Sequence, residues 1–214
     1  MNTITIKATL VASPVPPAAP STRIAVRVAA GDTMTIASLN LAAGHPLVTV
    51  TWGDGMTTSA PGGKFAHTYT SNGEYAIVIS DDVQSLCVVG TDEAAIASAP
   101  LIVGFTTDAQ LLTQLNSRAF EGCVNLSNPM LEAAKLDTLL PATFGMCLSL
   151  SGVLRFPSVA SIPGPGTLQP FVGCKGGITE IHFAIFSEES IKSSKAYGKD
   201  PTLGTGTAVL IFDL

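Results

Sequence analysis

The sequence has few charged and few aromatic residues. Asp, Glu, Lys and Arg account for 13% of the 214 residues, and Phe, Trp and Tyr for 6%, whereas charged residues usually make up about 25% of soluble domains. The 11 Lys and Arg are scattered and the net charge is −5, so the chain lacks the basic face that binds nucleic acid or an anionic membrane. Hydrophobic residues still reach 46%, and a chain of this length can bury a core.

Long apolar runs are also missing. Pro, Gly and charged residues interrupt every hydrophobic stretch before it reaches the about 20 residues of a membrane-spanning helix, so we expect no membrane insertion. Near the N-terminus, residues 3–10 alternate between Thr and apolar residues around Lys7, which predicts a strand. Pro14, Pro16 and Pro17 would break the helical core of a signal peptide. The sequence therefore contains no clear export signal.

The motifs of common enzyme classes are absent. The sequence contains no G-x-S-x-G, H-E-x-x-H, Walker A or dinucleotide-binding glycine motif. The acidic pairs at residues 81–82 and 188–189 are adjacent in sequence, so their side chains diverge and cannot form the facing carboxylates of a glycosidase. Three dispersed His and no C-x-x-C give no metal-ligand pattern. We expect no enzymatic activity, no cofactor and no bound metal.

The first part of the chain, residues 1–83, has the pattern of an antiparallel β-sandwich. Short alternating segments are separated by turn residues, and the clearest expected strands span residues 23–28, 33–39, 47–52 and 74–80. Gly53, Asp54 and Gly55 form one turn signal, because glycine permits positive φ and Asp can accept a hydrogen bond from its own backbone.

Three residues near this turn allow a structural and a functional interpretation. Trp52 could stack on a sugar, but a lone Trp at the end of a strand is more often part of the core. His67 could bind a ligand or act as a base, yet no nucleophile or second ligand lies nearby in sequence, which favours a hydrogen-bonded structural role. Asp54 is one carboxylate, whereas calcium needs six to eight oxygen ligands, so we interpret it as a turn residue.

The same segment resembles the polycystic-kidney-disease (PKD) domain family. That family combines a W-G-D-G turn with H-T-Y, then G-x-Y and a final alternating strand. The matching residues are Trp52, Gly53, Asp54, Gly55, His67, Thr68, Tyr69, Gly73 and Tyr75. The resemblance implies an immunoglobulin-like extracellular module that acts as a spacer or contacts proteins and carbohydrates.

Residues 84–214 contain an internal repeat. Phe120, Phe144 and Phe171 are separated by 24 and 27 residues, and each is followed three residues later by a cysteine. The full set of repeat positions is Phe120, Cys123, Leu126, Phe144, Cys147, Leu150, Phe171, Cys174 and Ile178. A period of this length predicts stacked coils with the phenylalanines forming an internal column. Equivalent cysteines in successive coils point in parallel, so we expect buried free thiols, including Cys87 in an apolar run, rather than disulfides.

The repeat unit F-x-x-C-x-x-L resembles the BspA-like leucine-rich repeat of bacterial surface proteins. The resemblance implies a short leucine-rich-repeat solenoid, with a degenerate first coil at residues 85–115. Pro129 and the insertion at residues 164–170 depart from the family pattern. A helix from Ser187 to Gly198 and a strand at residues 207–214 are expected to cap the C-terminal end. The predicted fold is therefore mainly β with some α, in two closely abutting domains.

The leading functional hypothesis is a non-enzymatic module that binds a protein or glycan surface in adhesion, outside the cell by family resemblance. Two alternatives remain: a structural or receptor-binding component of a phage particle, and an accessory carbohydrate-binding protein. Alternate residues of a strand face outward, which places the candidate contacts on exposed strand positions. They are Ser127, Asn128, Arg155, Glu180 and His182.

Overall fold

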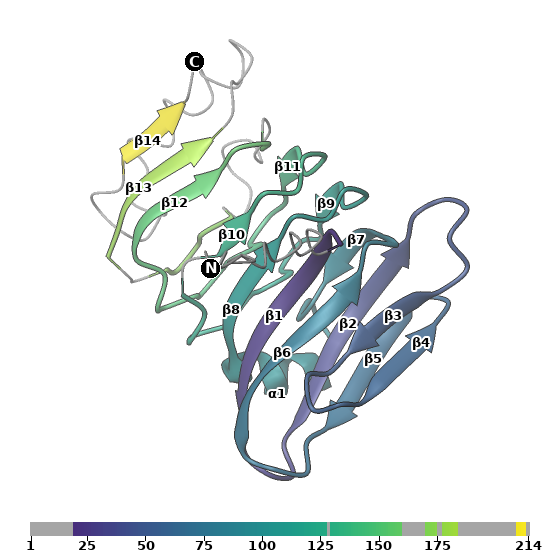
Figure 1. Ribbon diagram of the computed structural model, residues 1–214. Coiled ribbons are helices and arrows are strands. Elements are labelled where there is room, and N and C mark those ends of the chain that lie inside the picture. The colour runs from purple at the N-terminus through teal and green to yellow at the C-terminus, as the bar shows by residue number, and fades with distance from the viewer. Residues whose placement is uncertain (1–18, 128, 160–169, 175–176, 184–208, 213–214) are drawn as a thin grey trace, which may run out of the picture.

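The structure is a computed structural model that describes residues 19–127, 129–159, 170–174, 177–183 and 209–212 (Figure 1). Within these ranges it is mainly β, as the sequence predicts, with one short α-helix and one turn of 3₁₀-helix. The elements in the first half are β1 (Ser21–Val28), β2 (Thr33–Leu41), β3 (Val48–Thr51), β4 (Thr57–Ala60), β5 (Gly63–Thr68), β6 (Gly73–Ser80) and β7 (Val83–Cys87). Those that follow are α1 (Glu93–Ser98), the 3₁₀ turn Ala99–Leu101, β8 (Ile102–Thr107), β9 (Gln114–Leu115), β10 (Met130–Leu131), β11 (Thr138–Leu139), β12 (Gly152–Phe156), β13 (Ile178–Phe183) and β14 (Val209–Phe212).

The strands form mixed sheets. One has the strand order β10-β8-β1-β6-β3-β4 and another has the order β11-β9-β7-β2-β5. Figure 1 shows these two sheets as layers, with β1 and β6 in front of β2 and β7. A single buried hydrophobic cluster contains side chains from both layers, including Ile24 and Val50 of one sheet and Ile36 and Leu86 of the other. A third sheet has the order β12-β13-β14.

The four clearest strands expected from the sequence are present as β1, β2, β3 and β6. The alternation that predicts them is also visible in their burial, because inward side chains such as Ile77 and Ile79 are buried while Ala76 is exposed. The turn after β3 requires glycine at position 53: its φ is +88°, and a Cβ there would lie 2.8 Å from the carbonyl oxygen of Ala76. β4 and β5 were not predicted as separate strands.

Both large sheets continue past residue 83, the expected domain boundary. β7 pairs with β2 in an antiparallel register that aligns Leu86 with Leu39. β8 pairs with β1 and aligns Thr106 with Arg23. Strand pairing thus connects the segments on either side of residue 83, and the same hydrophobic cluster extends from Ile24 to the phenylalanines of the repeat.

Beyond β8, strands add to the sheets in parallel. Met130 of β10 pairs with Thr106 of β8, and Thr138 of β11 pairs with Gln114 of β9. In both cases the paired residues are 24 positions apart in sequence, which is the spacing between the first two repeats. β12, β13 and β14 are also parallel to one another.

The phenylalanines of the repeat stack on one another, as the sequence predicts. The ring centroid of Phe144 lies 5.5 Å from that of Phe120 and 5.6 Å from that of Phe171, and the planes are inclined by 8° and 10°. The cysteines connect the repeats in the same way: the Cys147 thiol donates to the Phe120 carbonyl at 3.1 Å, and the Cys174 thiol donates to the Phe144 carbonyl at 3.0 Å.

All four cysteines are buried and free. Burial raises the pKa of the Cys174 thiol to about 11, although a hydrogen bond with the backbone of Cys147 opposes this shift. Burial also raises the pKa values of Cys123 and Cys147. These thiols are neutral at physiological pH and contribute to packing rather than to nucleophilic chemistry.

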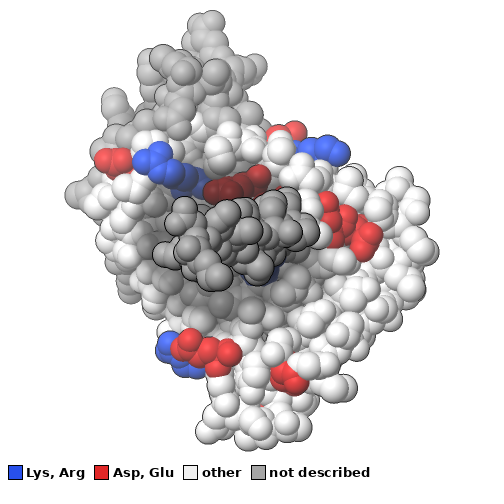
Figure 2. All heavy atoms as spheres, viewed as in Figure 1, with Lys and Arg blue, Asp and Glu red and all other residues white. Residues whose placement is uncertain are grey.

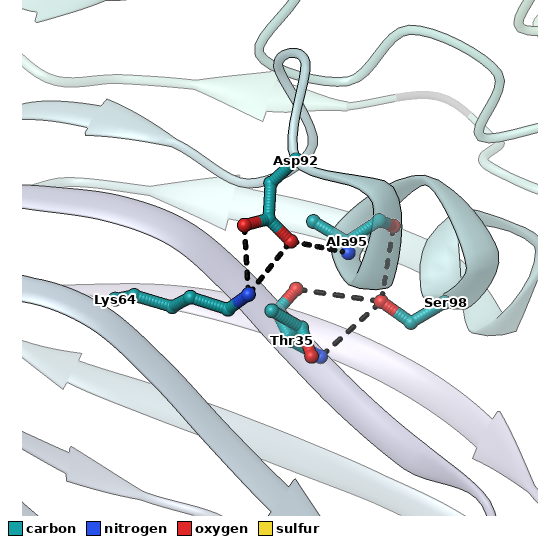
Figure 3. Close-up of polar contacts among 5 residues, drawn as sticks. All are labelled: Thr35, Lys64, Asp92, Ala95 and Ser98. Atoms are coloured by element: carbon teal, nitrogen blue, oxygen red, sulfur yellow. Dashed lines mark hydrogen bonds and ion pairs between the residues drawn. The ribbon is translucent and has the colours of Figure 1, made fainter.

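Helix α1 lies in the segment where the sequence predicts a degenerate coil. Asp92 is its N-cap: one carboxylate oxygen accepts from the amide of Ala95 at 3.0 Å and from Lys64 Nζ at 2.9 Å (Figure 3). Ser98 fixes the other end of the helix to β2, because its hydroxyl accepts from the amide of Thr35 at 3.2 Å. Asp92 followed by Glu93 and Ala94 is a helix-start signal. The prediction of a degenerate repeat in this segment did not include this helix.

Several expected elements lie outside the described residues. They are the N-terminal strand at residues 3–10 and the helix from Ser187 to Gly198. β14 lies within the strand expected at residues 207–214 and pairs with β13. No helix in the described part of the chain has the length and apolar character needed to cross a bilayer.

Candidate functional site

A shallow groove crosses the outer face of the sheet formed by β1, β8 and β10 and continues onto β12. Two adjoining hollows of about 240 and 170 Å³ share Met130 and Glu132 on their walls. The residues of this sheet groove are Arg23, Thr106, Thr107, Asp108, Pro129, Met130, Leu131, Glu132, Val153 and Arg155. The strand register brings Arg23, Thr106 and Met130 into one row across three strands.

The floor of the sheet groove is apolar and exposed. Met130 is 56% exposed and Val153 is 42% exposed. Each is followed by a buried leucine, Leu131 or Leu154, because alternate residues of a strand face opposite sides of the sheet. Met130 and Val153 therefore face solvent, while the leucines next to them anchor both strands in the core.

Charged groups surround this apolar floor. In the described part of the chain, the Arg23 guanidinium and the Glu132 carboxylate make no hydrogen bond or ion pair. Asp108 accepts a hydrogen bond from the amide of Ser21 at 2.8 Å. Figure 2 shows positive and negative side chains interspersed among uncharged atoms on this side of the molecule. The groove therefore has charges of both signs that are available to a partner.

Arg155, Glu180 and His182 form a hydrogen-bonded chain at the end of the groove. Arg155 pairs with His182 across β12 and β13, and the Arg155 Nη1 donates to His182 Nδ1 at 3.3 Å. His182 Nε2 lies 2.8 Å from Glu180 Oε2. A guanidinium can only donate, so Nδ1 is the acceptor from Arg155, and Nε2 faces the carboxylate of Glu180.

Three of the five predicted contact residues are thus brought together: Arg155, Glu180 and His182. Ser127 does not line the groove, and its hydroxyl donates to the carbonyl of Val103 at 3.3 Å. Asn128 lies outside the described residues.

Sequence reasoning missed Arg23, Met130, Glu132 and Val153. The sequence contains a signal for most of the groove. A central aliphatic residue is followed by a charged or titratable one in Met-Leu-Glu at 130–132, Val-Leu-Arg at 153–155 and Glu-Ile-His at 180–182. Arg23 carried no such signal, because its place beside β8 depends on a pairing between distant segments.

The cluster around Trp52 is structural. Trp52 is fully buried and its indole nitrogen donates to Thr58 Oγ1 at 3.0 Å. The His67 ring stacks on the indole at 5.1 Å, and His67 Nε2 lies 2.7 Å from Asp54 Oδ2. Burial alone would raise the pKa of Asp54, but hydrogen bonds from the Met56 amide and from His67 outweigh it and lower the pKa of this carboxyl. Each polar group has a partner within the cluster, which agrees with the structural interpretation of all three residues.

No three His, Cys, Asp or Glu side chains come together as metal ligands anywhere in the described ranges. No protein-family model, no curated protein and no solved structure matches this chain.

Proposed function

We propose that this chain is a non-enzymatic binding module of a bacterial surface-type protein and that its partner docks on the sheet groove. The observation that carries this proposal is the exposure of Met130 and Val153 on strands, in a groove where Arg23 and Glu132 lack partners among the described residues. Exposed apolar side chains within a polar rim are typical of interaction sites. Strands fix the positions of the contact residues, so little ordering accompanies binding.

We also propose that residues 1–83 form a PKD-like, immunoglobulin-like sandwich and that residues 84–214 form a BspA-like leucine-rich-repeat solenoid. The parallel pairing of strands 24 residues apart supports the second assignment. The stacked phenylalanines and the thiol hydrogen bonds between repeats support it as well. In such an arrangement each added coil widens the outer face, so the groove extends with the number of repeats.

A polypeptide is the partner that best fits the sheet groove. Among the described residues that line it, only Thr106 and Thr107 carry a hydroxyl and none has an amide side chain, whereas a sugar needs several neutral groups that donate and accept hydrogen bonds. Aliphatic floor residues and flanking charges instead suit an apolar side chain next to charged neighbours. Arg23 and Arg155 provide cationic contacts, and Glu132 provides an anionic one.

Selection from a phage-displayed library of random dodecapeptides tests this proposal. Peptides that bind the purified chain should bind the Met130→Glu variant at least about tenfold more weakly, because burying a Met side chain contributes about 1.5–3 kcal/mol. Met56→Glu is the matched control, since Met56 is 58% exposed in the turn before β4 and lies outside the groove. The assignment is refuted if the selected peptides bind Met130→Glu as tightly as they bind the unaltered chain. It is also refuted if no peptide binds and the chain instead binds a glycan on an array in a way that requires Met130.

A further inference from the structure

Another hollow lies beside helix α1, on a different part of the molecule from the sheet groove. It has a volume of about 660 Å³, which is within the range of about 300–1,000 Å³ typical of small-ligand sites. Its walls come from the middle of β2, the end of β7, the loop before α1 and the turn after β9. The residues of this polar hollow are Ala37, Ser38, Cys87, Gly90, Thr91, Asp92, Asn116, Ser117 and Arg118.

The charges on the walls of the polar hollow are neutralised by the protein itself. Asp92 forms an ion pair with Lys64 at 2.7 Å, which Figure 3 shows at the start of α1. Arg118 Nε lies 3.3 Å from a carboxylate oxygen of Glu121. An anionic or cationic ligand would therefore find an already compensated charge and would gain little from it.

A purely apolar ligand would leave most of these side chains without a hydrogen-bond partner, because only Ala37, Cys87 and Gly90 among the described lining residues lack a side-chain oxygen or nitrogen. Burial raises the pKa of Cys87 to about 11, so its thiol is neutral at physiological pH. The remaining side chains carry hydroxyl, amide, carboxylate or guanidinium groups. A ligand that matches these walls is neutral and rich in groups that both donate and accept hydrogen bonds.

Two hydrogen-bonding side chains of the hollow, Asn116 and Ser117, are oriented by the protein and keep unused hydrogen-bonding capacity. The Asn116 side-chain oxygen accepts from Gln114 Nε2 at 2.7 Å, which orients the amide and leaves its two N–H groups. The Ser117 hydroxyl donates to the carbonyl of Pro141 at 2.8 Å and keeps its lone pairs. The hydroxyls of Ser38 and Thr91 make no hydrogen bond within the described residues. Groups that are already oriented lose less entropy on binding.

We propose that the polar hollow binds a neutral polyhydroxylated ligand, such as one or two hexose units of a glycan. Each sugar hydroxyl donates and accepts one or more hydrogen bonds, and it can use an Asn116 N–H together with a Ser117, Ser38 or Thr91 oxygen. This site is separate from the sheet groove and does not depend on the function proposed for it.

Titration of the ¹⁵N-labelled chain with glucose, galactose, mannose and N-acetylglucosamine, each at millimolar concentration, tests this inference. The expected result is a set of saturable amide shifts confined to residues 90–92 and 116–118, with at least one of these sugars. Asn116→Ala should weaken that binding about fivefold, the cost of one hydrogen bond. Ser38→Trp should abolish it by filling the hollow.

Asn40→Ala is the matched control, because Asn40 lies on β2, does not line the hollow, and loses a single side-chain hydrogen bond, from Nδ2 to Ser85 Oγ at 2.8 Å. Met130→Glu controls for the sheet groove and should bind sugar normally. The inference is overturned if none of the four sugars shifts these amides, or if Asn116→Ala binds as tightly as Asn40→Ala. Neither result would bear on peptide binding in the groove.

Discussion

Replacing Phe144 with Ala tests the column of rings that joins the repeats. Phe144 is fully buried and lies between Phe120 and Phe171 in a nearly parallel stack. Phe156 contacts it from a third side, with ring centroids 6.1 Å apart. Removing this ring leaves a cavity with aromatic walls on three sides, and each of those walls is fixed by its own strand or turn.

The expected cost is large because the cavity cannot close. Phe→Ala in a core costs about 3–5 kcal/mol, and each aromatic pair contributes about 0.5–1.5 kcal/mol beyond its buried area. With two stacked partners lost, we expect Phe144→Ala to lower the free energy of unfolding by about 5 kcal/mol, at the upper end of this range. Phe144→Leu keeps most of the volume and should cost about 1.5 kcal/mol.

Urea denaturation followed by far-UV circular dichroism measures these changes, provided that the variants share one m-value, the slope of the free energy of unfolding against urea concentration. Leu148→Ala is the control, since Leu148 is exposed in the same repeat and should change the free energy of unfolding by less than about 0.5 kcal/mol. A cost below about 2 kcal/mol for Phe144→Ala would be inconsistent with a cavity that stays open and would refute the proposed role of the stack.

Two further predictions concern backbone strain and pH. Met146 has φ +57°, a strained value for a residue with a Cβ, at the position where the neighbouring repeats have Gly122 and Gly173. Met146→Gly should therefore raise the free energy of unfolding by about 1 kcal/mol in the same urea assay. A decrease would show that the contacts of the Met146 side chain outweigh the strain. The pKa of Asp54 is lowered in the folded state, so its ionised carboxylate stabilises the fold above pH 3.8, and this stabilisation is lost as pH falls through the folded-state pKa. Asp54→Asn should therefore reduce the dependence of the free energy of unfolding on pH at acid pH. An unchanged slope below pH 5 would contradict this.

The sequence was informative where a pattern depends on local geometry. Alternation of apolar and polar residues predicted β1, β2, β3 and β6, because side chains of an extended strand face opposite sides regardless of which strand lies next to it. The repeat of Phe and Cys predicted the ring stack and the buried thiols, because equivalent residues of stacked units point in parallel. Short strands such as β4, with the uncharged sequence TTSA, carry no comparable pattern.

The candidate contact residues show the same division. Arg155 and His182 were expected on exposed strand positions, and the parallel pairing of β12 with β13 brings them within 3.3 Å. Asn116 and Ser38 were not singled out, because neither has a local pattern and their common hollow forms only when β2, β7 and the turn after β9 come together.

By itself the sequence determined the mainly β character of this protein, the inward position of its repeat phenylalanines and the neutral state of its buried thiols. Those properties follow from spacing along the chain and from side-chain type. Only the tertiary structure decided that Arg23, Met130 and Arg155 share one groove and that the sheets continue past residue 83. The reason is that strand partners and their register are set by long-range packing of the two layers, which no short segment encodes.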